Sequence, residues 1–272
     1  MAILIGYDET PYGEDAIELG VRLAPLSADP VVVGCGYSGD HRGLIVAGQL
    51  PTPARDEAER KLTTARSIIG DRVEARYVSI GPASPSRALH EYAYQRDISL
   101  MVLGSSQRGA VGRLSLSSTV ERVLSGAPCP VAVAPRGYRK RHDHIGEVGV
   151  AFDGTPEAQQ ALNFGARLAQ MTATKLRLIA VAARDTEKFQ DLLDRAATQL
   201  PEELDVTTSV IADSDVVDIL AVLPAPQPGV LVCGSRGYGR AKQVLLGSVS
   251  SQVVRAAAYP VIVVPKGARS ER

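Results

Sequence analysis

Residues 3–24 read ILIGYDETPYGEDAIELGVRLA, and residues 148–169 read VGVAFDGTPEAQQALNFGARLA. The two stretches align without a gap. Each contains an apolar run, an aspartate, a Thr-Pro step and a helical pattern that ends in Arg-Leu-Ala. A self-match of this length at a fixed offset indicates a repeated structural unit. The chain is therefore expected to contain two copies of one fold.

Two later segments repeat as well. SLMVLGSSQRG (99–109) matches GVLVCGSRGYG (229–239), and APCPVAVAP (127–135) matches AAYPVIVVP (257–265). The offset falls from 145 residues at the first match to 130 at the last, so the first copy contains about fifteen additional residues. The segment 38–53, which contains Gly and Pro, is predicted to be a loop insertion that holds part of this excess. The polar, basic stretch 136–144 is the predicted linker, which gives expected domains of 1–140 and 145–272.

The composition fits two globular domains. The chain has 272 residues, of which 45% are hydrophobic and 22% are charged, so each half can build a core. Thirty basic and thirty acidic residues give zero net charge, which argues against nucleic acid or an acidic membrane surface as a partner. No stretch approaches the roughly 18 apolar residues of a membrane span, and the first residues carry no basic leader. The three cysteines, an odd number, are far apart in the sequence and favour a reducing cytoplasm: Cys35, Cys129 and Cys233.

Within each copy, short apolar runs alternate with helical patterns. In the second copy, strands are predicted at 148–152, 175–181, 205–211, 230–233 and 261–264. Apolar residues recur at helical spacing between them, as they do at Ala58, Leu62, Ala65 and Ile69 of the first copy. Strands that alternate with helices imply right-handed crossovers and a parallel sheet covered on both faces. The predicted fold class is α/β, with two tandem doubly wound domains.

In such sheets, ligands bind beyond the carboxyl ends of the strands. One loop there contains Asp153, after the first strand of the second copy. The other begins at Gly234 after the fourth strand, runs through Ser235, Arg236 and Gly237, and reaches Gly247-Ser248 after nine residues. Glycines allow backbone N–H groups to approach an anion, and the following helix directs its unpaired N–H groups and positive dipole end toward it. The combination predicts a phosphate-binding site.

Simpler interpretations exist for each fragment. Gly-Ser-Arg-Gly alone is an ordinary loop, and Ser248 alone is an ordinary helix N-cap. Their joint occurrence in a repeated α/β unit favours phosphate binding. Two alternatives stay open for Asp153, which can accept from a ribose hydroxyl or an adenine amino group, or can simply begin the turn into the helix.

The pattern Gly-x2-Gly-x9-Gly-Ser, the strand-Asp-Gly-Thr-Pro opening and the Ala-Pro-Cys-Pro-Val and Ala-Tyr-Pro-Val endings closely resemble the universal stress protein family. The resemblance covers nearly the whole chain, twice. It implies a five-stranded parallel sheet in each copy, ordered 3-2-1-4-5, with the last strands of paired domains associating. It also implies ATP binding in members that retain the glycines. Tandem members pair their own two domains and often dimerise further, so a homodimer through the last strands is expected in addition.

The resemblance also implies site residues. Asp153 and Val181 would lie near adenine and ribose, while the phosphates would be held by Gly234, Gly237, Gly247, Ser248 and Val249. Ser235 belongs to the same loop, and the cations Arg236, Arg240 and Lys242 are candidate phosphate contacts, although exposed loop cations are more often solvated. The expected cofactor is ATP, with or without Mg²⁺.

The first copy departs from the glycine pattern. Gln107 and Ser117 stand where the second and third glycines would be, and Ser118 is retained. If φ is positive at these positions, a Cβ costs about 1 kcal/mol or more at each. A weaker candidate site therefore consists of Asp8, Gly104, Ser105, Gly109, Ser117 and Ser118. Whether it holds ATP stays open.

Three functions are compatible with the sequence. The preferred one is an ATP-binding stress or signalling regulator that acts by conformation or by binding protein partners, which the sequence does not identify. The alternatives are a slow ATP hydrolase or phosphotransferase, and a ligand-free dimerisation scaffold. The chain lacks a Gly-x4-Gly-Lys-Ser/Thr loop and an obvious catalytic base, which disfavours an enzyme. His142 and His144 are expected to be solvated rather than metal ligands, and Cys129 is expected to be a buried small hydrophobe.

Overall fold

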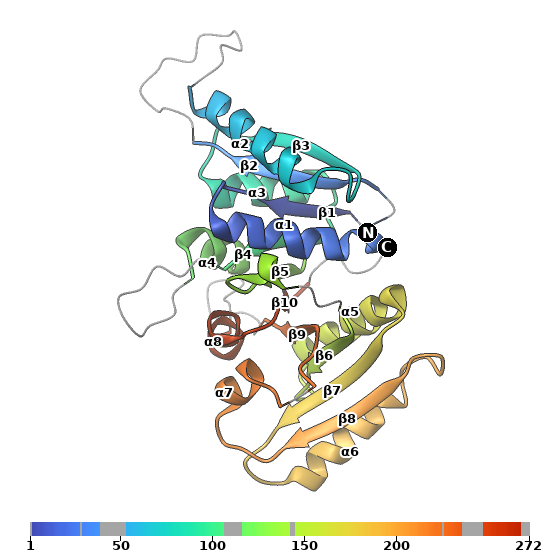
Figure 1. The fold of residues 1–272 in the computed structure, drawn as a ribbon. Coiled ribbons are helices and arrows are strands. Elements are labelled where there is room, and N and C mark those ends of the chain that lie inside the picture. The colour runs from blue at the N-terminus through green and yellow to red at the C-terminus, as the bar shows by residue number, and fades with distance from the viewer. Residues whose placement is uncertain are drawn as a thin grey trace.

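Alternating strands and helices run through both halves of the chain in this computed structural model, which describes residues 2–27, 29–38, 53–105, 116–141, 145–224, 226–235 and 247–267 (Figure 1). The first half contains β1 (Ile3–Gly6), α1 (Pro11–Leu23), η1 (Ala24–Leu26), β2 (Val31–Gly36), α2 (Pro53–Ile69), β3 (Ala75–Ile80), α3 (Pro85–Gln95), β4 (Leu100–Gly104), α4 (Ser118–Leu124), β5 (Val131–Ala134) and η2 (Tyr138–Lys140). The second contains β6 (Glu147–Ala151), α5 (Pro156–Thr172), β7 (Lys175–Val181), α6 (Thr186–Ala197), β8 (Val206–Ile211), α7 (Val216–Ala221), β9 (Val230–Gly234), α8 (Ser248–Ala256) and β10 (Val261–Val264). None of the described helices is long and apolar enough to cross a membrane.

The ten strands of the described residues form one sheet, in the order β3-β2-β1-β4-β5-β10-β9-β6-β7-β8. Each half is parallel and has the order 3-2-1-4-5, which confirms the predicted fold class. The halves join through antiparallel pairing of β5 and β10, with Val133 opposite Val261. The last strands of the two domains therefore associate within the chain.

This pairing limits how a homodimer can form. Strand β5 lies between β4 and β10, and β10 lies between β5 and β9. Both hydrogen-bonding edges of each last strand are thus occupied, so neither has an edge to offer a second chain. The additional homodimer stays a prediction, but its interface cannot be an extension of the sheet at these strands.

The predicted strands of the second copy agree with the structure. The ranges 175–181 and 261–264 are confirmed at both ends, and the other three are displaced by one residue at one or both ends.

Helices α1 and α5 begin where the repeated Thr-Pro step predicts. The hydroxyl oxygens of Thr10 and Thr155 accept hydrogen bonds from the N–H groups of Gly13 and Ala158, each at 3.2 Å. These hydroxyls satisfy N–H groups that have no partner within the helix, which fixes the start of each helix.

Two hydrophobic layers cover the sheet, and both continue across the junction of the two halves. One layer lies beneath α1, α2, α5 and α6 and includes Ile3 and Val148; the other lies beneath α3, α4, α7 and α8 and includes Met101 and Leu231. All four side chains are fully buried. Because each layer contains residues of both domains, the domains share their cores across the β5–β10 junction.

The beginning of the predicted linker packs against the first domain. The buried carboxylate of Asp15, on α1, accepts from the backbone N–H groups of Gly137 (2.8 Å) and Arg139 (2.9 Å) and from the Arg139 guanidinium (3.1 Å). The Tyr138 ring is buried, with the Arg22 guanidinium 4.5 Å from its centroid. The described part of the linker is therefore held on α1 rather than extended in solvent.

Several predictions concern residues outside the described ranges. They are the loop insertion between residues 39 and 52, the histidines at 142 and 144, and the two glycine-rich loops at 106–115 and 236–246. The loops contain Gln107 and Gly109 of the first copy and Arg236, Gly237, Arg240 and Lys242 of the second. Predictions for these residues stay predictions.

Candidate functional site

A cavity of about 300 Å³ lies at the carboxyl ends of β6, β7 and β9 in the second domain. This is the position expected for a ligand in a doubly wound sheet. Among the predicted residues, the cavity is lined by Asp153, Val181, Gly234, Gly247 and Val249. The fold thus brings together predicted residues that are nearly 100 positions apart in the sequence.

Asp153 both shapes the turn and offers an acceptor to a ligand. Its Oδ1 atom accepts from the N–H (3.0 Å) and hydroxyl (2.6 Å) groups of Thr155, the N-cap of α5. Its Oδ2 atom has no partner among the described residues. The two interpretations of Asp153 are therefore compatible, because one carboxylate oxygen builds the turn and the other remains available in the cavity.

The backbone of Val181 faces the same cavity. Alternate residues of a strand direct their N–H and C=O groups to opposite neighbouring strands. The Ile179 oxygen accepts from Phe152 on the β6 side (2.8 Å), and the N–H of Ala182 donates to Ile211 on the β8 side (3.0 Å). Val181 therefore directs its N–H and C=O groups toward the β6 side, where β6 has already ended. These groups form a donor and acceptor pair suited to the edge of a flat heterocycle.

Helix α8 begins at the cavity without a side-chain cap. Its N-cap, Gly247, has φ −60° and ψ 147° and lines the cavity, as do Val249 and Ser250. The negative φ is open to any residue, so the lack of a side chain is what distinguishes glycine here. No side chain of the described residues caps the first N–H groups of α8, and the helix dipole favours an anion beside them. Ser248 is exposed at the first helical position and does not line the described cavity.

Gly234 and Ser235 make packing and hydrogen-bond contacts within the second domain. A Cβ on Gly234 would lie 2.5 Å from the backbone oxygen of Glu157, so glycine allows β9 to end close against α5. Ser235 is completely buried, and its hydroxyl accepts from the N–H of Lys266 at 3.2 Å. These contacts explain both residues without a phosphate.

The sequence did not indicate several residues that line this cavity: Glu157, Phe189, Val216, Leu220 and Val253. The Glu157 carboxylate lies 3.2 Å from the Lys266 ammonium, which compensates its charge. Phe189, Val216 and Leu220 come from α6 and α7, and only tertiary packing brings these helices to the carboxyl edge of the sheet. For Glu157 the sequence does carry a signal that it lines the site, because it follows Thr155 of the predicted turn by two residues.

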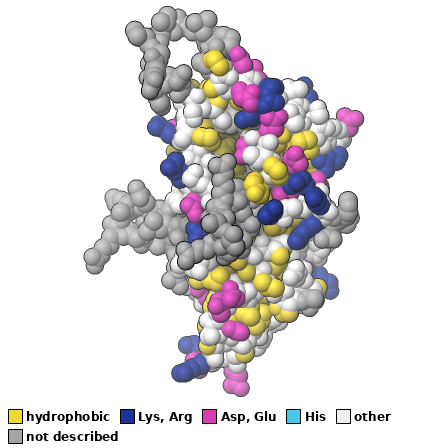
Figure 2. Space-filling model, turned by 60° about the vertical axis from the view of Figure 1, so that its left-hand side comes forward, with side chains coloured by type: hydrophobic (Ala, Val, Ile, Leu, Met, Phe, Trp, Pro, Cys, Tyr) yellow, Lys and Arg dark blue, Asp and Glu magenta, His cyan; other side chains and the backbone are white. Residues whose placement is uncertain are grey.

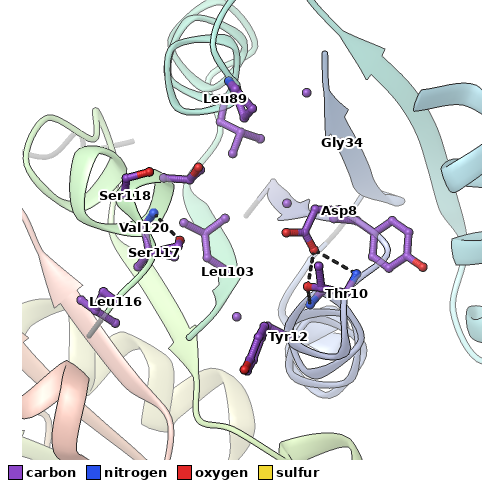
Figure 3. A pocket seen from close by; sticks show the side chains of 17 residues that line it. Asp8, Thr10, Tyr12, Gly34, Leu89, Leu103, Leu116, Ser117, Ser118 and Val120 are labelled. Atoms are coloured by element: carbon purple, nitrogen blue, oxygen red, sulfur yellow. Dashed lines mark hydrogen bonds between the residues drawn. The ribbon is translucent and has the colours of Figure 1, made fainter. Parts of the chain in front are cut away.

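A second cavity, of about 390 Å³, occupies the corresponding place in the first domain. Four predicted residues line it: Asp8, Gly104, Ser117 and Ser118. Figure 3 shows Asp8 and Ser117 on opposite sides of this cavity, with Leu103 between them and Leu89 above. Ser105 is buried, its N–H donates to the Ala134 oxygen at 2.9 Å, and it does not line the described cavity. Gly34 and Gly36, which line the cavity from β2, were not predicted.

Ser117 corrects the expected cost of losing the third glycine. Its φ is −64° and its ψ is 151°, close to the values at Gly247, so the backbone is not left-handed and the Cβ causes no such strain. The Ser117 hydroxyl instead accepts from the N–H of Val120 at 3.1 Å. The substitution therefore caps helix α4 with a side chain, which α8 lacks.

Glu9, next to Asp8, has a left-handed backbone with φ 61°; Gly154 stands at the equivalent place with φ 79°. The Arg60 guanidinium donates to both Glu9 carboxylate oxygens, and the Thr64 hydroxyl donates to one of them at 2.9 Å. The hydrogen bonds from Arg60, and next those from Thr64, lower the pKa of Glu9 to about 2. This network holds the turn that places Asp8.

We expect the contribution of Glu9 to stability to disappear in acid. A carboxyl whose pKa is lower in the folded state stabilises the protein above its unfolded pKa of about 4.5, and this stabilisation is lost as the pH falls toward 2. The difference in the free energy of unfolding between the wild-type chain and Glu9→Gln should therefore be constant above pH 5 and shrink below it. Urea denaturation at a series of pH values measures this difference. A difference that is unchanged at pH 3 or below would contradict the assignment.

The three cysteines are free and buried, which confirms the expectation that Cys129 is buried. Burial raises the pKa of Cys129 and of Cys233 to about 12 and also raises that of Cys35. These thiols therefore stay protonated near neutral pH, and Cys233 presents a thiol rather than a thiolate to the second cavity. The described residues contain no group of three or more His, Cys, Asp or Glu side chains that could hold a metal ion.

Known proteins resemble this chain along its whole length. Residues 1–135 and 145–265 each match the Universal stress protein family. A universal stress protein of Mycobacterium tuberculosis strain H37Rv is 26% identical over 97% of this chain and 100% of its own length. The crystal structure of a universal stress protein from Archaeoglobus fulgidus has a TM-score of 0.75 and 22% identity, covering 98% of each chain. A structure of a putative universal stress protein from Pseudomonas aeruginosa has a TM-score of 0.66 and 14% identity, covering 97% of this chain and 93% of its own. The chain belongs to the universal stress protein family, and it does so as a tandem, two-domain member.

Proposed function

We propose that this protein binds ATP in the cavity of its second domain and acts as a regulator whose conformation or choice of partner depends on nucleotide occupancy. The observation that carries the proposal is the start of α8, which opens on the cavity at Gly247 without a capping side chain. Unpaired N–H groups at a helix N-terminus are a natural site for phosphate. A cytoplasmic location and unidentified protein partners are part of the same proposal.

The other walls of the cavity suit the rest of the nucleotide. The N–H and C=O groups of Val181 would pair with the edge of the adenine ring. The free Oδ2 of Asp153 would accept from the ribose hydroxyls. The apolar side chains of Phe189 and Leu220 would contact the ring faces. When Mg²⁺ is present it would arrive with the phosphates, because Mg²⁺ usually takes only one or two protein carboxylates.

Binding without rapid chemistry fits the described side chains better than catalysis. Hydrolysis or phosphoryl transfer requires a group that positions the nucleophile at the terminal phosphate. The carboxylates of the described cavity are those of Asp153, which orders the turn, and Glu157, which is paired with Lys266. Slow hydrolysis, phosphotransfer and a ligand-free scaffold are therefore alternative outcomes of the test.

Calorimetric titration of the full chain with ATP tests the proposal, with one ATP per chain expected at the second-domain site. Asp153→Asn keeps the side-chain oxygen of the turn but loses the carboxylate, and should weaken ATP binding about 10-fold because a hydrogen bond to a charged group is worth about 1.5–3 kcal/mol. Asp8→Asn, the matched change in the first domain, should leave the ATP affinity within about twofold.

Three results would contradict the proposal. Absence of ATP binding would favour the scaffold. Equal losses from Asp8→Asn and Asp153→Asn would contradict a single ATP site in the second domain. Saturable ATP turnover that is abolished by Glu157→Gln, while ATP still binds, would favour the enzyme.

A further inference from the structure

The junction of the two domains has a pseudo-two-fold axis, on which residues at equivalent positions meet. The matching segments 127–135 and 257–265 contain β5 and β10 and are 130 residues apart, so Ala132 is the counterpart of Ile262. The same two residues are direct partners in the antiparallel pairing of these strands. A homotypic junction, formed by two copies of one domain in this register, would therefore place each of them opposite itself.

The side chains on this axis are small in one domain and large in the other. Ala132, Ala134 and Ile262 are completely buried in the hydrophobic layer beneath α1, α2, α5 and α6. By the register, the isoleucine has Ala132 opposite and Ala134 diagonal to it. Two facing isoleucines would overfill this space, whereas two facing alanines would leave part of it empty. Both faults destabilise a packed core.

The other face of the same strands does not distinguish the domains. It carries valine at the four junction positions, all within the second hydrophobic layer: Val131, Val133, Val261 and Val263. A homotypic junction would bring the same residue type together on this face. Discrimination by shape at the strands therefore depends on the face that carries Ala132 and Ile262.

A one-sided ion pair joins the helices that flank the junction. The Arg255 guanidinium, in the last turn of α8, lies 2.7 Å from the Glu121 carboxylate, in the first turn of α4. The equivalent positions are Ser125 and Ser251, whose hydroxyls donate to backbone oxygens of their own helices. In a homotypic junction, Glu121 would face Ser125 or Arg255 would face Ser251, so no opposite charges would meet at these positions.

Selection by charge is local at this junction. Acidic and basic side chains of the described residues are intermixed on the face shown in Figure 2. Such a surface has no broad field that would favour one domain over the other. The pair of Glu121 and Arg255 is partly exposed, so it contributes modestly and is sensitive to salt.

We propose that the junction is a heterotypic docking surface, which fits one first domain to one second domain and discriminates against two like domains. Ala132 and Ile262 provide the shape, and Glu121 and Arg255 provide the charge. Because each chain contains one domain of each kind, heterotypic pairing can close within the chain, whereas homotypic pairing would connect one chain to the next. The partner of either last strand is therefore the unlike domain. The proposal is independent of nucleotide binding.

Single substitutions in the full chain reproduce the homotypic contacts, so the domains need not be separated. Ala132→Ile places two isoleucines on the axis, and Ile262→Ala places two alanines there. Thermal denaturation should show a Tm lower by about 3 °C for the first and by about 5 °C or more for the second, because overpacking and cavities cost stability. The double variant exchanges the two side chains and should recover at least half of the larger loss.

Ile69→Ala is the matched control for this exchange. Ile69 is buried in the same hydrophobic layer, but it belongs to α2, which packs on β2 and β3 away from the junction. Its loss in Tm should add to that of Ala132→Ile, because distant sites are independent. If the losses of Ala132→Ile and Ile262→Ala also added, the selection by shape would be overturned.

The ion pair provides a second test on partly exposed residues, whose variants are expected to fold. Glu121→Ser and Arg255→Ser copy the two homotypic contacts and should each lower Tm by about 1–2 °C at low salt. The variant with both changes should lose less than the sum of the single losses, and the coupling should shrink in about 0.5 M NaCl. Additive losses at low salt would overturn the role given to charge, and additive losses at both pairs would overturn the heterotypic surface.

Discussion

Replacing Asp15 with alanine is expected to lower the free energy of unfolding by about 3 kcal/mol. The carboxylate is completely buried and accepts three hydrogen bonds, two from the backbone N–H groups of Gly137 and Arg139 and one from the Arg139 guanidinium. Alanine would leave the two N–H groups without an acceptor in a site with little access to water. The guanidinium is partly exposed, so water can replace its lost partner and limit the effect.

Urea denaturation of the wild-type chain and the variant measures this loss. Gln160 of α5 stands at the equivalent position in the second domain, and its side-chain oxygen is buried without a partner among the described residues. Gln160→Ala is therefore the matched control and should cost less than about 1 kcal/mol. Asp15→Asn, which keeps one acceptor oxygen, should fall between the two. A loss below about 1 kcal/mol in Asp15→Ala would show that the segment from Gly137 to Arg139 does not depend on this carboxylate.

The linker illustrates what the sequence could not predict. The stretch 136–144 is polar and basic, which is typical of a solvated connection, and its buried residue Tyr138 gives no local signal. Its docking depends on Gly137, whose φ of 78° turns the chain back toward α1. It also depends on Asp15, which belongs to a helix pattern and looks like an ordinary surface carboxylate. The contact joins residues more than 120 positions apart, so neither partner identifies the other in the sequence.

The fold, in contrast, was predictable because its signals are local and occur twice. The run from Lys175 to Val181 is apolar enough for a buried strand and is bounded by helix patterns, and the structure places β7 over the same residues. The buried positions of α2 are the four that its spacing predicts. The strand order came from the family resemblance, since periodicity identifies strands but does not order them.

The candidate site was predictable only in part. Asp153, Val181 and Gly247 follow strands or begin a helix at the carboxyl edge, where the topology itself brings residues together. The contributions of Phe189 and Leu220 depend on how α6 and α7 pack, which no spacing in the sequence specifies. For Gly234, the sequence suggested approach to phosphate, whereas the close contact is with the backbone of α5.

Gly247→Val is expected to weaken ATP binding by the second domain about 100-fold. A phosphate at the start of α8 would gain from the helix dipole, up to about 2 kcal/mol in a partly buried setting, and from hydrogen bonds to the first N–H groups. A branched side chain at the N-cap would cover these groups, and a loss of about 2.7 kcal/mol corresponds to the 100-fold change. Since φ at Gly247 is −60°, valine fits the backbone there, and poor capping should cost about 1 kcal/mol of folding stability.

The control for this change is Ser117→Val in the first domain, which removes a real cap from α4 but lies at the cavity without the predicted phosphate site. It should reduce stability at least as much as Gly247→Val while leaving the ATP affinity within about twofold. Gly247→Ser gives an intermediate step, because serine can cap α8 as Ser117 caps α4, and about a 10-fold loss of ATP affinity is expected.

Calorimetry with ATP on the three variants ranks the effects. If Ser117→Val weakened ATP binding as much as Gly247→Val, the loss would follow from general damage to the paired domains. If neither did, phosphate would not bind at α8. Only the graded series, with valine at 247 worst, serine at 247 intermediate and valine at 117 neutral, assigns the phosphates to the uncapped helix.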